Sequence, residues 1–456
     1  MPDDGVKNDF SLPDLSRFYF DRVWVKAYPV FFSNLREPRN YDVYVHYRDS
    51  GVFEDMTDSA FRLYRTLRLI RDGLARGYSV DDIPRHVDEL ARYGERDFYE
   101  FYSNGEEVVI HVADRKYHLK LSQVKTVRFV EYTKVINDRV YFEKAIYMEL
   151  APYLRIIVKP YLSGFVPPMI RLLYNPLIRV KVKLGLGDFG YEHVHDNFID
   201  PEQVDLGKFI ELNHRYAFDR ELADRARMLW RMWFNRDEDL RIKVTQVELS
   251  YDSKIPKIKL AYAFHFLGGR AKTIKNSVDS GAYYWDEAGL KYYITIRKGL
   301  QLKAYTKAWS SQGVLNRVEF TVNINEDLDS VDAGSVIRRS DLAEAYLTLK
   351  KALLDESGAE RIRELIRPLI DCRSDCDRHY AFWLDLLISG QVKGSRYYRH
   401  IVEVYRRKGL IKVSGRGRNS VYVLDSSLIP LAEKLREAIG VSFKELAIPH
   451  VETEEE

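Results

Sequence analysis

The sequence predicts an α+β protein in which helices flank a mostly antiparallel sheet, followed by a smaller C-terminal domain of helices and a hairpin. Many segments alternate apolar and polar residues, as strands with one buried face do. The connections between the later strands are too short for the crossover helices that a parallel sheet needs. Segments with helical spacing separate the strand groups, and the length of 456 residues suits roughly two to four domains.

The first part of the chain is expected to form a polar, flexible arm, residues 1–18, and an N-terminal α+β domain, residues 19–165. Strands are predicted at "FYFDRVWVKAYPVFF" and "YDVYVHY", where apolar and aromatic residues alternate. Helical spacing follows in "DSAFRLYRTLRLIRDGLARG" and "SVDDIPRHVDELARYGERDFYEFY". Strands return at "EEVVIHVADRKYHLKLS" and "VKTVRFVEYTKV". Prolines then mark the domain boundary: Pro160, Pro167, Pro168 and Pro176.

The second domain, residues 166–340, is expected to begin with a strand, a helix and a strand: "LIRVKVKLGLG", "DRELADRARMLWRMWF" and "RIKVTQVELSYD". Further strands are predicted at "KIKLAYAFHFL", "LKYYITIRKG", "LQLKAYTKA" and "LNRVEFTVNI". A helical connector, residues 341–375, leads to a C-terminal domain, residues 376–446, and an acidic tail, residues 447–456. The sequence has no repeat at a fixed period.

Charge is distributed unevenly along the chain. The formal net charge is only +3, from 71 Lys and Arg against 68 Asp and Glu. Residues 391–420 nevertheless contain nine basic residues and a single acid, Glu403, and residues 288–318 contain six basic residues and no acid. The like charges in such a block repel one another unless a bound polyanion neutralises them. The two basic blocks therefore indicate a nucleic-acid partner.

The C-terminal domain has the layout of a winged helix-turn-helix. A helix precedes a basic helix, and a hairpin with an arginine-rich tip follows. In that layout the second helix enters the major groove of duplex DNA and the wing contacts phosphates. A solvated basic face on a helical protein-binding module is the alternative. The DNA-binding candidates are Lys393, Ser395, Arg396, Tyr398, Arg399, Arg406, Arg416 and Arg418.

Three carboxylates stand in strands where a simple core would have apolar residues. Glu248 and Asp252 are four residues apart on one predicted strand, so both lie on the same face. Glu319 stands among apolar residues of another strand. Converging carboxylates repel unless a cation binds between them, and oxygen ligands favour Mg²⁺ or Mn²⁺. Alternatively, the three acids belong to solvated strand faces.

Tyr305 is the candidate nucleophile. It lies in the acid-free stretch, in "KAYTK", two residues before Lys307. A neighbouring lysine is expected to favour the phenolate by lowering the tyrosine pKa. With a divalent ion to polarise a phosphate, these residues permit phosphodiester transfer through a tyrosine. The alternative is that Tyr305 is an ordinary member of a set of 32 tyrosines.

In order and rough spacing, these segments resemble the rolling-circle replication initiators of staphylococcal-type plasmids, the replication initiation factor family. "TQVELSYD", "YYITIRKGLQLKAYTK" and "NRVEFTV" carry the resemblance, which covers about residues 180–325. The sequence departs from the family pattern with Glu248 for Asp, Gln246 for Arg, no Gly-Ser in "YYITIRKG" and one residue fewer between Arg297 and Tyr305.

The resemblance implies a DNA-nicking domain at residues 166–340, built on a nicking-endonuclease core. Tyr305 matches the nucleophile that becomes joined to the 5′ phosphate, and Glu248, Asp252 and Glu319 match metal-coordinating acids. The matching basic residues are Arg297, Lys307 and Arg317. The implied function is a replication initiator that binds a double-stranded origin and nicks one strand with Mg²⁺ or Mn²⁺. The family further implies a helicase partner and a homodimer.

Two other functions remain open. One is a non-enzymatic origin-binding or partition protein on an inactive nuclease scaffold. The other is a conjugative relaxase, in which His193 and His195 of "YEHVHDNF" would hold the metal. The acidic first 14 residues are not expected to form a secretory signal, no apolar run is long enough to predict a membrane span, and two cysteines suit a reducing compartment. A cytoplasmic location without membrane partners is therefore expected.

Overall fold

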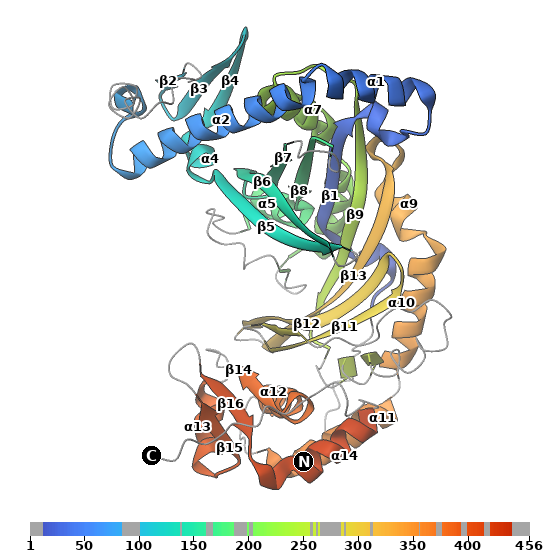
Figure 1. Cartoon of the computed structure of the whole chain (residues 1–456). Coiled ribbons are helices and arrows are strands. Elements are labelled where there is room, and N and C mark those ends of the chain that lie inside the picture. The colour runs from blue at the N-terminus through green and yellow to red at the C-terminus, as the bar shows by residue number, and fades with distance from the viewer. Residues whose placement is uncertain are drawn as a thin grey trace.

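The computed structural model describes residues 12–83, 101–136, 139–160, 167–186, 198–199, 204–255, 259–260, 263–264, 284–286, 289–310, 313–354, 356–370, 376–393, 399–414 and 420–439. Its largest element is a ten-stranded antiparallel sheet with the order β10-β11-β12-β13-β9-β1-β8-β7-β6-β5 (Figure 1). The strands are β1 (Tyr19–Pro29), β5 (Arg128–Ile136), β6 (Arg139–Ala151), β7 (Leu154–Lys159), β8 (Met169–Tyr174), β9 (Leu240–Ser253), β10 (Tyr284–Asp286), β11 (Gly289–Arg297), β12 (Leu300–Ser310) and β13 (Gly313–Asp327). The expected α+β architecture with a large antiparallel sheet and flanking helices is confirmed.

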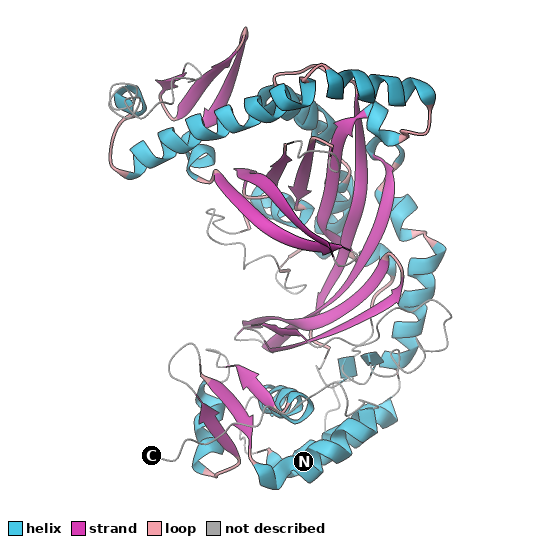
Figure 2. Cartoon of the chain, in the orientation of Figure 1, coloured by secondary structure: helices cyan, strands magenta, loops and turns pink. Residues whose placement is uncertain are grey.

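Helices cover the back and the edges of this sheet (Figure 2). Helix α7 contacts β8 and β9, and α5 and α6 contact β1. A separate three-stranded sheet consists of β2 (Phe101–Asn104), β3 (Glu107–Val112) and β4 (Arg115–Lys120). Among the described residues up to 366, the helices with defined bounds are α1 (Pro38–Asp49), α2 (Val52–Ala75), α4 (Leu121–Lys125), α5 (Pro176–Leu184), α6 (Leu206–Ala217), α7 (Glu221–Phe234), α9 (Ala333–Ile337), α10 (Ser340–Leu353) and α11 (Glu356–Ile366).

The C-terminal elements include the expected helices and hairpin strands in order, with one strand, β14, that was not predicted. They are α12 (Cys376–Ser389), β14 (Gln391–Lys393), α13 (Arg399–Arg407), β15 (Ile411–Ser414), β16 (Val421–Leu424) and α14 (Ile429–Ile439). The strands form a small antiparallel sheet with the order β14-β16-β15. Phe382 and Trp383 of α12 pack against Tyr405 of α13, and all three side chains are buried. These contacts form an aromatic cluster in the C-terminal region that is continuous with the main hydrophobic core.

The ten-stranded sheet has a buried face and an open face. Along β1, Val23, Val25 and Ala27 are buried, whereas Arg22 is exposed and Lys26 is half-buried. Successive strand residues point to opposite faces, so this alternation identifies the two sides of the sheet.

The sheet is built from two halves with the same topology. In the first half, β1 is followed by helices and by the meander β5-β6-β7-β8, whose last strand pairs with β1. In the second half, β9 precedes the meander β10-β11-β12-β13, whose last strand pairs with β9. The halves join through the antiparallel β1–β9 pair. The expected boundary at 165/166 falls between β7 and β8, which are neighbours in this one sheet.

Three predicted strands are wrong where the structure describes them. "YDVYVHY" lies in α1, "LIRVKVKLGLG" lies in α5, and Lys259, Leu260, Ala263 and Phe264 of "KIKLAYAFHFL" are helical. Helix start signals override the alternating pattern in the first two segments, because a proline at the first turn presets the helical backbone. Pro38 starts α1 and Pro176 starts α5, where the Asn175 side chain also accepts a hydrogen bond from the Ile178 N–H at 3.0 Å.

Most of the second predicted helix, residues 79–102, lies outside the described residues, and its last two residues belong to β2. Within the part of the chain that the structure describes, no helix is both long and apolar enough to cross a membrane.

Candidate functional site

Three acidic side chains converge on the open face of the sheet. Asp21 on β1, Glu248 on β9 and Glu319 on β13 each place a carboxylate oxygen within 4.8 Å of the other two. All three residues are buried, with at most 5% of their surface exposed. Glu248 and Glu319 were predicted to converge, and the structure brings them together. Asp21 was not predicted.

A β-bulge explains why the sequence pattern misses Asp21. Phe20 pairs with Leu249 and Arg22 pairs with Glu248, so β1 has one extra residue, Asp21, between two consecutive residues of β9. A bulge interrupts the two-residue alternation and redirects a side chain. In a regular strand, Asp21 would share the buried face with Val23; the bulge instead allows its carboxylate to reach Glu248 and Glu319.

Lys303 and Tyr305, both on β12, connect directly to this acid cluster. The Lys303 ammonium donates to Glu248 Oε1 at 3.1 Å and to Glu319 Oε1 at 2.6 Å. The Tyr305 hydroxyl donates to Glu319 Oε2 at 2.8 Å. Arg22 approaches Glu248 from the exposed side at 3.7 Å. The candidate nucleophile therefore shares a carboxylate with the cluster.

The two glutamates of the cluster have opposite pKa shifts. Burial and the neighbouring Glu319 raise the pKa of Glu248 to about 7, against the pull of Lys303. Burial also opposes ionisation of Glu319, yet Lys303, Arg317 and the Tyr305 hydrogen bond bring its pKa down to about 2. Near neutral pH, Glu319 is a carboxylate, while Glu248 exchanges its proton in the physiological range.

The pKa of Tyr305 itself is raised well above the usual 10, chiefly by burial and by the negative charge of Glu319. The expectation of a pKa lowered by lysine is therefore wrong in this state of the protein. Tyr305 is a neutral phenol that donates its hydrogen to a carboxylate. Ionisation requires a cation that replaces or outweighs the influence of Glu319.

Asp252 lies beside the cluster but belongs to a second, fully buried network. Its carboxylate accepts hydrogen bonds from Arg317 at 2.7 and 2.8 Å, from the Tyr19 hydroxyl at 2.5 Å and from the Ile199 N–H at 2.8 Å. Arg317 also donates to Asp21 at 2.8 Å. Removing one partner of such a buried pair typically costs about 3–5 kcal/mol, so this network holds β1, β9 and β13 together.

The acid cluster offers negative charge and oxygen donors of the kind that divalent cations bind. Once Glu248 is ionised, the four acids at this point, Asp21, Glu248, Asp252 and Glu319, carry one charge more than the three cations Arg22, Lys303 and Arg317. Two buried hydroxyls, Ser250 Oγ and Thr321 Oγ1, have no hydrogen-bond partner among the described residues. They lie on the strands that carry the glutamates, because Ser250 pairs with Glu319 and Thr321 pairs with Glu248. Oxygen donors of this kind suit Mg²⁺ or Mn²⁺ and its bound water.

Of the other predicted catalytic residues, Arg317 is brought to the site and Arg297 is not. Arg297 pairs with Leu300 at the β11–β12 turn and forms an ion pair with Asp341. Leu300 lies five residues before Tyr305 on β12, so roughly 16 Å of strand separate Arg297 from Tyr305. The register of β12 shifts between Thr306 and Ala308, at Lys307. The face on which the Lys307 side chain lies therefore cannot be deduced by counting alternate residues from Tyr305. That side chain lies outside the described residues.

Most of the predicted DNA-binding and histidine residues lie outside the described residues. Ser395, Arg396, Tyr398, Arg416, Arg418, His193 and His195 belong to this group. The backbones of Lys393 and Arg399 are described in β14 and α13, but their side chains are not. Arg406 is exposed on α13 and pairs with Glu403 at 3.1 Å.

No family model and no curated protein matches the sequence. Two solved structures are similar to parts of it. One is the di-domain ARO/CYC StfQ from the steffimycin biosynthetic pathway, with 12% identity, a TM-score of 0.17 and coverage of 52% of this chain and 87% of that one. The other is the di-domain ARO/CYC BexL from the BE-7585A pathway, with 12% identity, a TM-score of 0.14 and coverage of 59% and 92%. Similarities at these TM-scores carry no argument about function.

Proposed function

We propose that this protein is a replication initiator of the rolling-circle type, which nicks one DNA strand through Tyr305 and becomes covalently joined to it. The observation that carries the proposal is the hydrogen bond of 2.8 Å from the Tyr305 hydroxyl to Glu319, a member of the three-acid cluster. A tyrosine oxygen beside a divalent-cation site is the arrangement that metal-assisted transfer of a phosphodiester requires.

The side chains divide the chemistry among themselves. The hydrogen bond to Glu319 Oε2 orients the Tyr305 oxygen, and the phenol proton leaves to solvent, because a carboxylate with a pKa of about 2 does not retain it. The phenolate oxygen forms a bond to phosphorus as the bond from phosphorus to the 3′ oxygen breaks, and that oxygen takes a proton from water. Lys303, held by both glutamates, supplies positive charge next to the reacting phosphate.

Asp21, Glu248 and Glu319 would hold the Mg²⁺ or Mn²⁺ ion. When bound, the ion polarises the phosphate and opposes the negative charge that raises the pKa of Tyr305. The Arg317 network acts indirectly, because it fixes Asp21 and the three strands that carry the cluster.

We assign duplex origin binding to residues 376–446, as a winged helix-turn-helix. The order α12, β14, α13, β15, β16 and α14 matches that layout. Arg406 and Arg407 are exposed on α13, the helix that would approach the DNA.

The test is a covalent-adduct assay with a pool of single-stranded DNA of random sequence and Mn²⁺, resolved on a denaturing gel. Wild-type protein is expected to form a protein–DNA adduct that EDTA prevents. Tyr305→Phe should form none, since the nucleophilic oxygen is missing. The matched control is Tyr251→Phe, because Tyr251 lies on β9 in register with Val318, one residue from Ser250 and on the opposite face. An adduct that persists in Tyr305→Phe would disprove the assignment.

A second candidate is a DNA-binding protein without nuclease activity. The Lys303 ammonium already bonds to both glutamates, and Tyr305 is neutral, as expected for a purely structural polar network. Supercoiled plasmid carrying the cognate origin, incubated with and without Mn²⁺, separates the two functions. Nicked circles support the initiator, and intact plasmid with retained duplex binding supports the second candidate.

A further inference from the structure

The open face of the sheet also carries a line of cations, distant from the acid cluster along the strands. Directly paired residues of antiparallel strands share a face, so the pairing register identifies side chains that lie in one line. The line runs through the pairs Arg128–Tyr147, Tyr147–Ile157, Ile157–Arg171, Arg171–Lys26 and Lys26–Lys243. We call its four cations, Arg128, Arg171, Lys26 and Lys243, the cation row.

The centre of the cation row lacks neutralising acids. Within the described part of the chain, neither Lys26 nor Arg171 has a carboxylate partner; the Lys26 ammonium lies 5.1 Å from the centre of the Tyr28 ring. Burial and the nearby cations Arg171, Lys159 and Lys243 lower the pKa of Lys26. Like charges directly opposite one another destabilise a sheet, so the cation row lowers the stability of the free protein. A bound polyanion would neutralise these charges and remove the repulsion.

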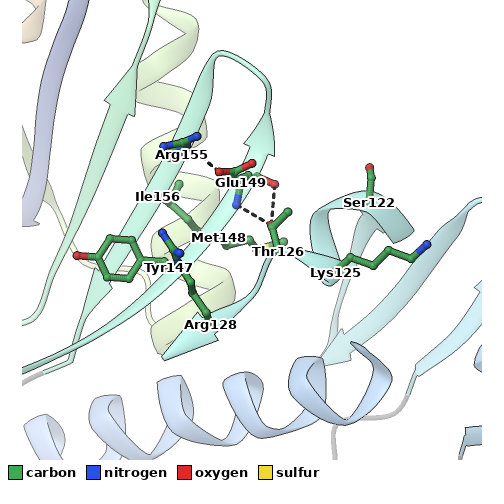
Figure 3. Close-up of a pocket in the computed structure, with 9 residues that line it drawn as sticks. All are labelled: Ser122, Lys125, Thr126, Arg128, Tyr147, Met148, Glu149, Arg155 and Ile156. Carbon is green, nitrogen blue, oxygen red and sulfur yellow. Dashed lines mark hydrogen bonds and ion pairs between the residues drawn. The ribbon is translucent and has the colours of Figure 1, made fainter. Parts of the chain in front are cut away.

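One end of the cation row opens into a pocket of about 440 Å³ (Figure 3). There the Arg128 guanidinium lies 5.4 Å from the centre of the Tyr147 ring. Lys125 also lines the pocket, and Arg155 is neutralised by Glu149 at 2.8 Å. The pocket therefore combines positive charge with an aromatic ring.

An aromatic side chain lies between the cation row and the acid cluster. On β1, Trp24 stands between Lys26 and Arg22, and it pairs with Gln246 in the line of residues next to Lys26–Lys243. Arg22 in turn pairs with Glu248 of the acid cluster. Lys243 and Glu248 are five residues apart on β9, so roughly 16 Å separate the row from the cluster.

We propose that the open face of β1, β8 and β9 binds the single-stranded DNA next to the nick site, with phosphates on the cation row and a base stacked on Trp24. Cations that follow the backbone and an aromatic platform are the two features of sequence-independent single-strand binding. The first half of the sheet thus holds the strand that the second half cuts. This inference rests on the proposed function.

Equilibrium binding of fluorescent oligo(dT) in the Tyr305→Phe background tests the inference without cleavage. The variant Lys26→Ala/Arg171→Ala should bind about tenfold more weakly, and the salt dependence of log K should flatten by about 1.4, for two lost phosphate contacts. The control variant Lys116→Ala/Lys144→Ala removes the same amount of charge outside the cation row: Lys116 is on β4, and Lys144 pairs with Glu131. This variant should bind oligo(dT) as tightly as the background protein.

Two further readouts separate a ligand site from a structural role. Without DNA, Lys26→Ala/Arg171→Ala should melt at an equal or higher temperature, since it relieves repulsion. Trp24→Ala should weaken oligo(dT) binding about tenfold, whereas Trp24→Phe should retain most of it. Unchanged oligo(dT) binding in the double variant, or a stronger effect on duplex than on single-stranded DNA, would overturn the inference. The adduct assay with Tyr305→Phe tests the proposed nicking function, and the oligo(dT) measurements test the single-strand site. Either proposal can therefore fail while the other holds.

Discussion

Glu248 and Glu319 have the same side chain and lie close together, but their different neighbours give them different pKa values. Glu319 accepts hydrogen bonds from both Lys303 and Tyr305, whereas Glu248 shares Lys303 and lies beside the negative charge of Glu319. One carboxyl therefore remains ionised and the other carries a proton up to about pH 7. A pair of acids with separated pKa values is what acid–base chemistry at neutral pH requires.

This pair predicts how stability depends on pH in metal-free protein. The folded pKa of Glu248, about 7, exceeds its ordinary value of 4.5, so the folded state binds the proton more tightly and its stability falls as pH rises from 4.5 to 7. Glu319, with a folded pKa of about 2, loses its contribution only as pH falls below 4.5. Urea unfolding in EDTA should show at most about 3 kcal/mol of loss between pH 4.5 and 7.

Glu248→Gln is the decisive variant for this prediction, since it keeps the shape and removes the titration. Its unfolding free energy should stay nearly level between pH 4.5 and 7. Glu437→Gln on α14, a residue outside the cluster, should behave like the wild type. A wild-type profile for Glu248→Gln would show that another group is responsible.

At the scale of the element, irregularities within strands decide which side chains reach the acid cluster. The bulge in β1 delivers Asp21 to the acid cluster, and the register shift in β12 falls directly after Tyr305 and Thr306. In the C-terminal region, α13 buries Ile401, Val402 and Tyr405 and leaves Arg406 and Arg407 exposed. One helix can therefore hold the small aromatic cluster together and still expose cations, as the proposed duplex binding requires.

The α13 helix provides a prediction about duplex binding. Arg406→Ala/Arg407→Ala removes two exposed cations whose ion-pair partner within the described part of the chain is Glu403. If both contact phosphates, the affinity for the duplex origin falls and the salt slope of log K decreases by about 1.8. A gel-shift titration over a range of salt concentrations measures both quantities. Arg361→Ala/Lys434→Ala, on α11 and α14, is the charge-matched control, and equal binding by the two double variants would contradict the assignment.

At the scale of the whole molecule, two halves of like topology form one sheet with different chemistry at corresponding strands. In the second half, β12 and β13 carry Lys303, Tyr305 and Glu319; in the first half, the corresponding β7 and β8 carry Lys159 and Arg171. The shared β1–β9 pair brings both sets onto one continuous open face. The proposed binding of a DNA strand across both halves requires this arrangement.

The continuous sheet predicts cooperative unfolding of the two halves. The β1–β9 pair joins them along ten registered residue pairs and the buried Arg317 network ties them further, so neither half should melt alone. Hydrogen exchange followed by mass spectrometry in rising urea should report one common transition for β6–β8 and β11–β13. Loss of protection in one half at lower urea would indicate independent domains.

The sequence alone determined the features that depend on local pattern. These include most strands of the sheet, the helices α2, α7, α10 and α12, the basic C-terminal region, and Glu248 and Glu319 as unusual acids in strands. Side-chain periodicity and turn residues encode such features within a few positions of the chain. The same local pattern misled at α1 and α5, because an alternating run preceded by a helix start signal forms a helix.

Only the tertiary structure decided which acids meet. Asp21 reaches the cluster through a bulge, and Asp252 is withdrawn from it by Arg317 and Tyr19, residues 65 and 233 positions away in the sequence. The register of β1 against β8 and β9 likewise created the cation row and revealed the two halves that show no sequence repeat. Strand register is set by packing over the whole sheet, and a shift of one residue moves every side chain to the other face. No local pattern contains that information.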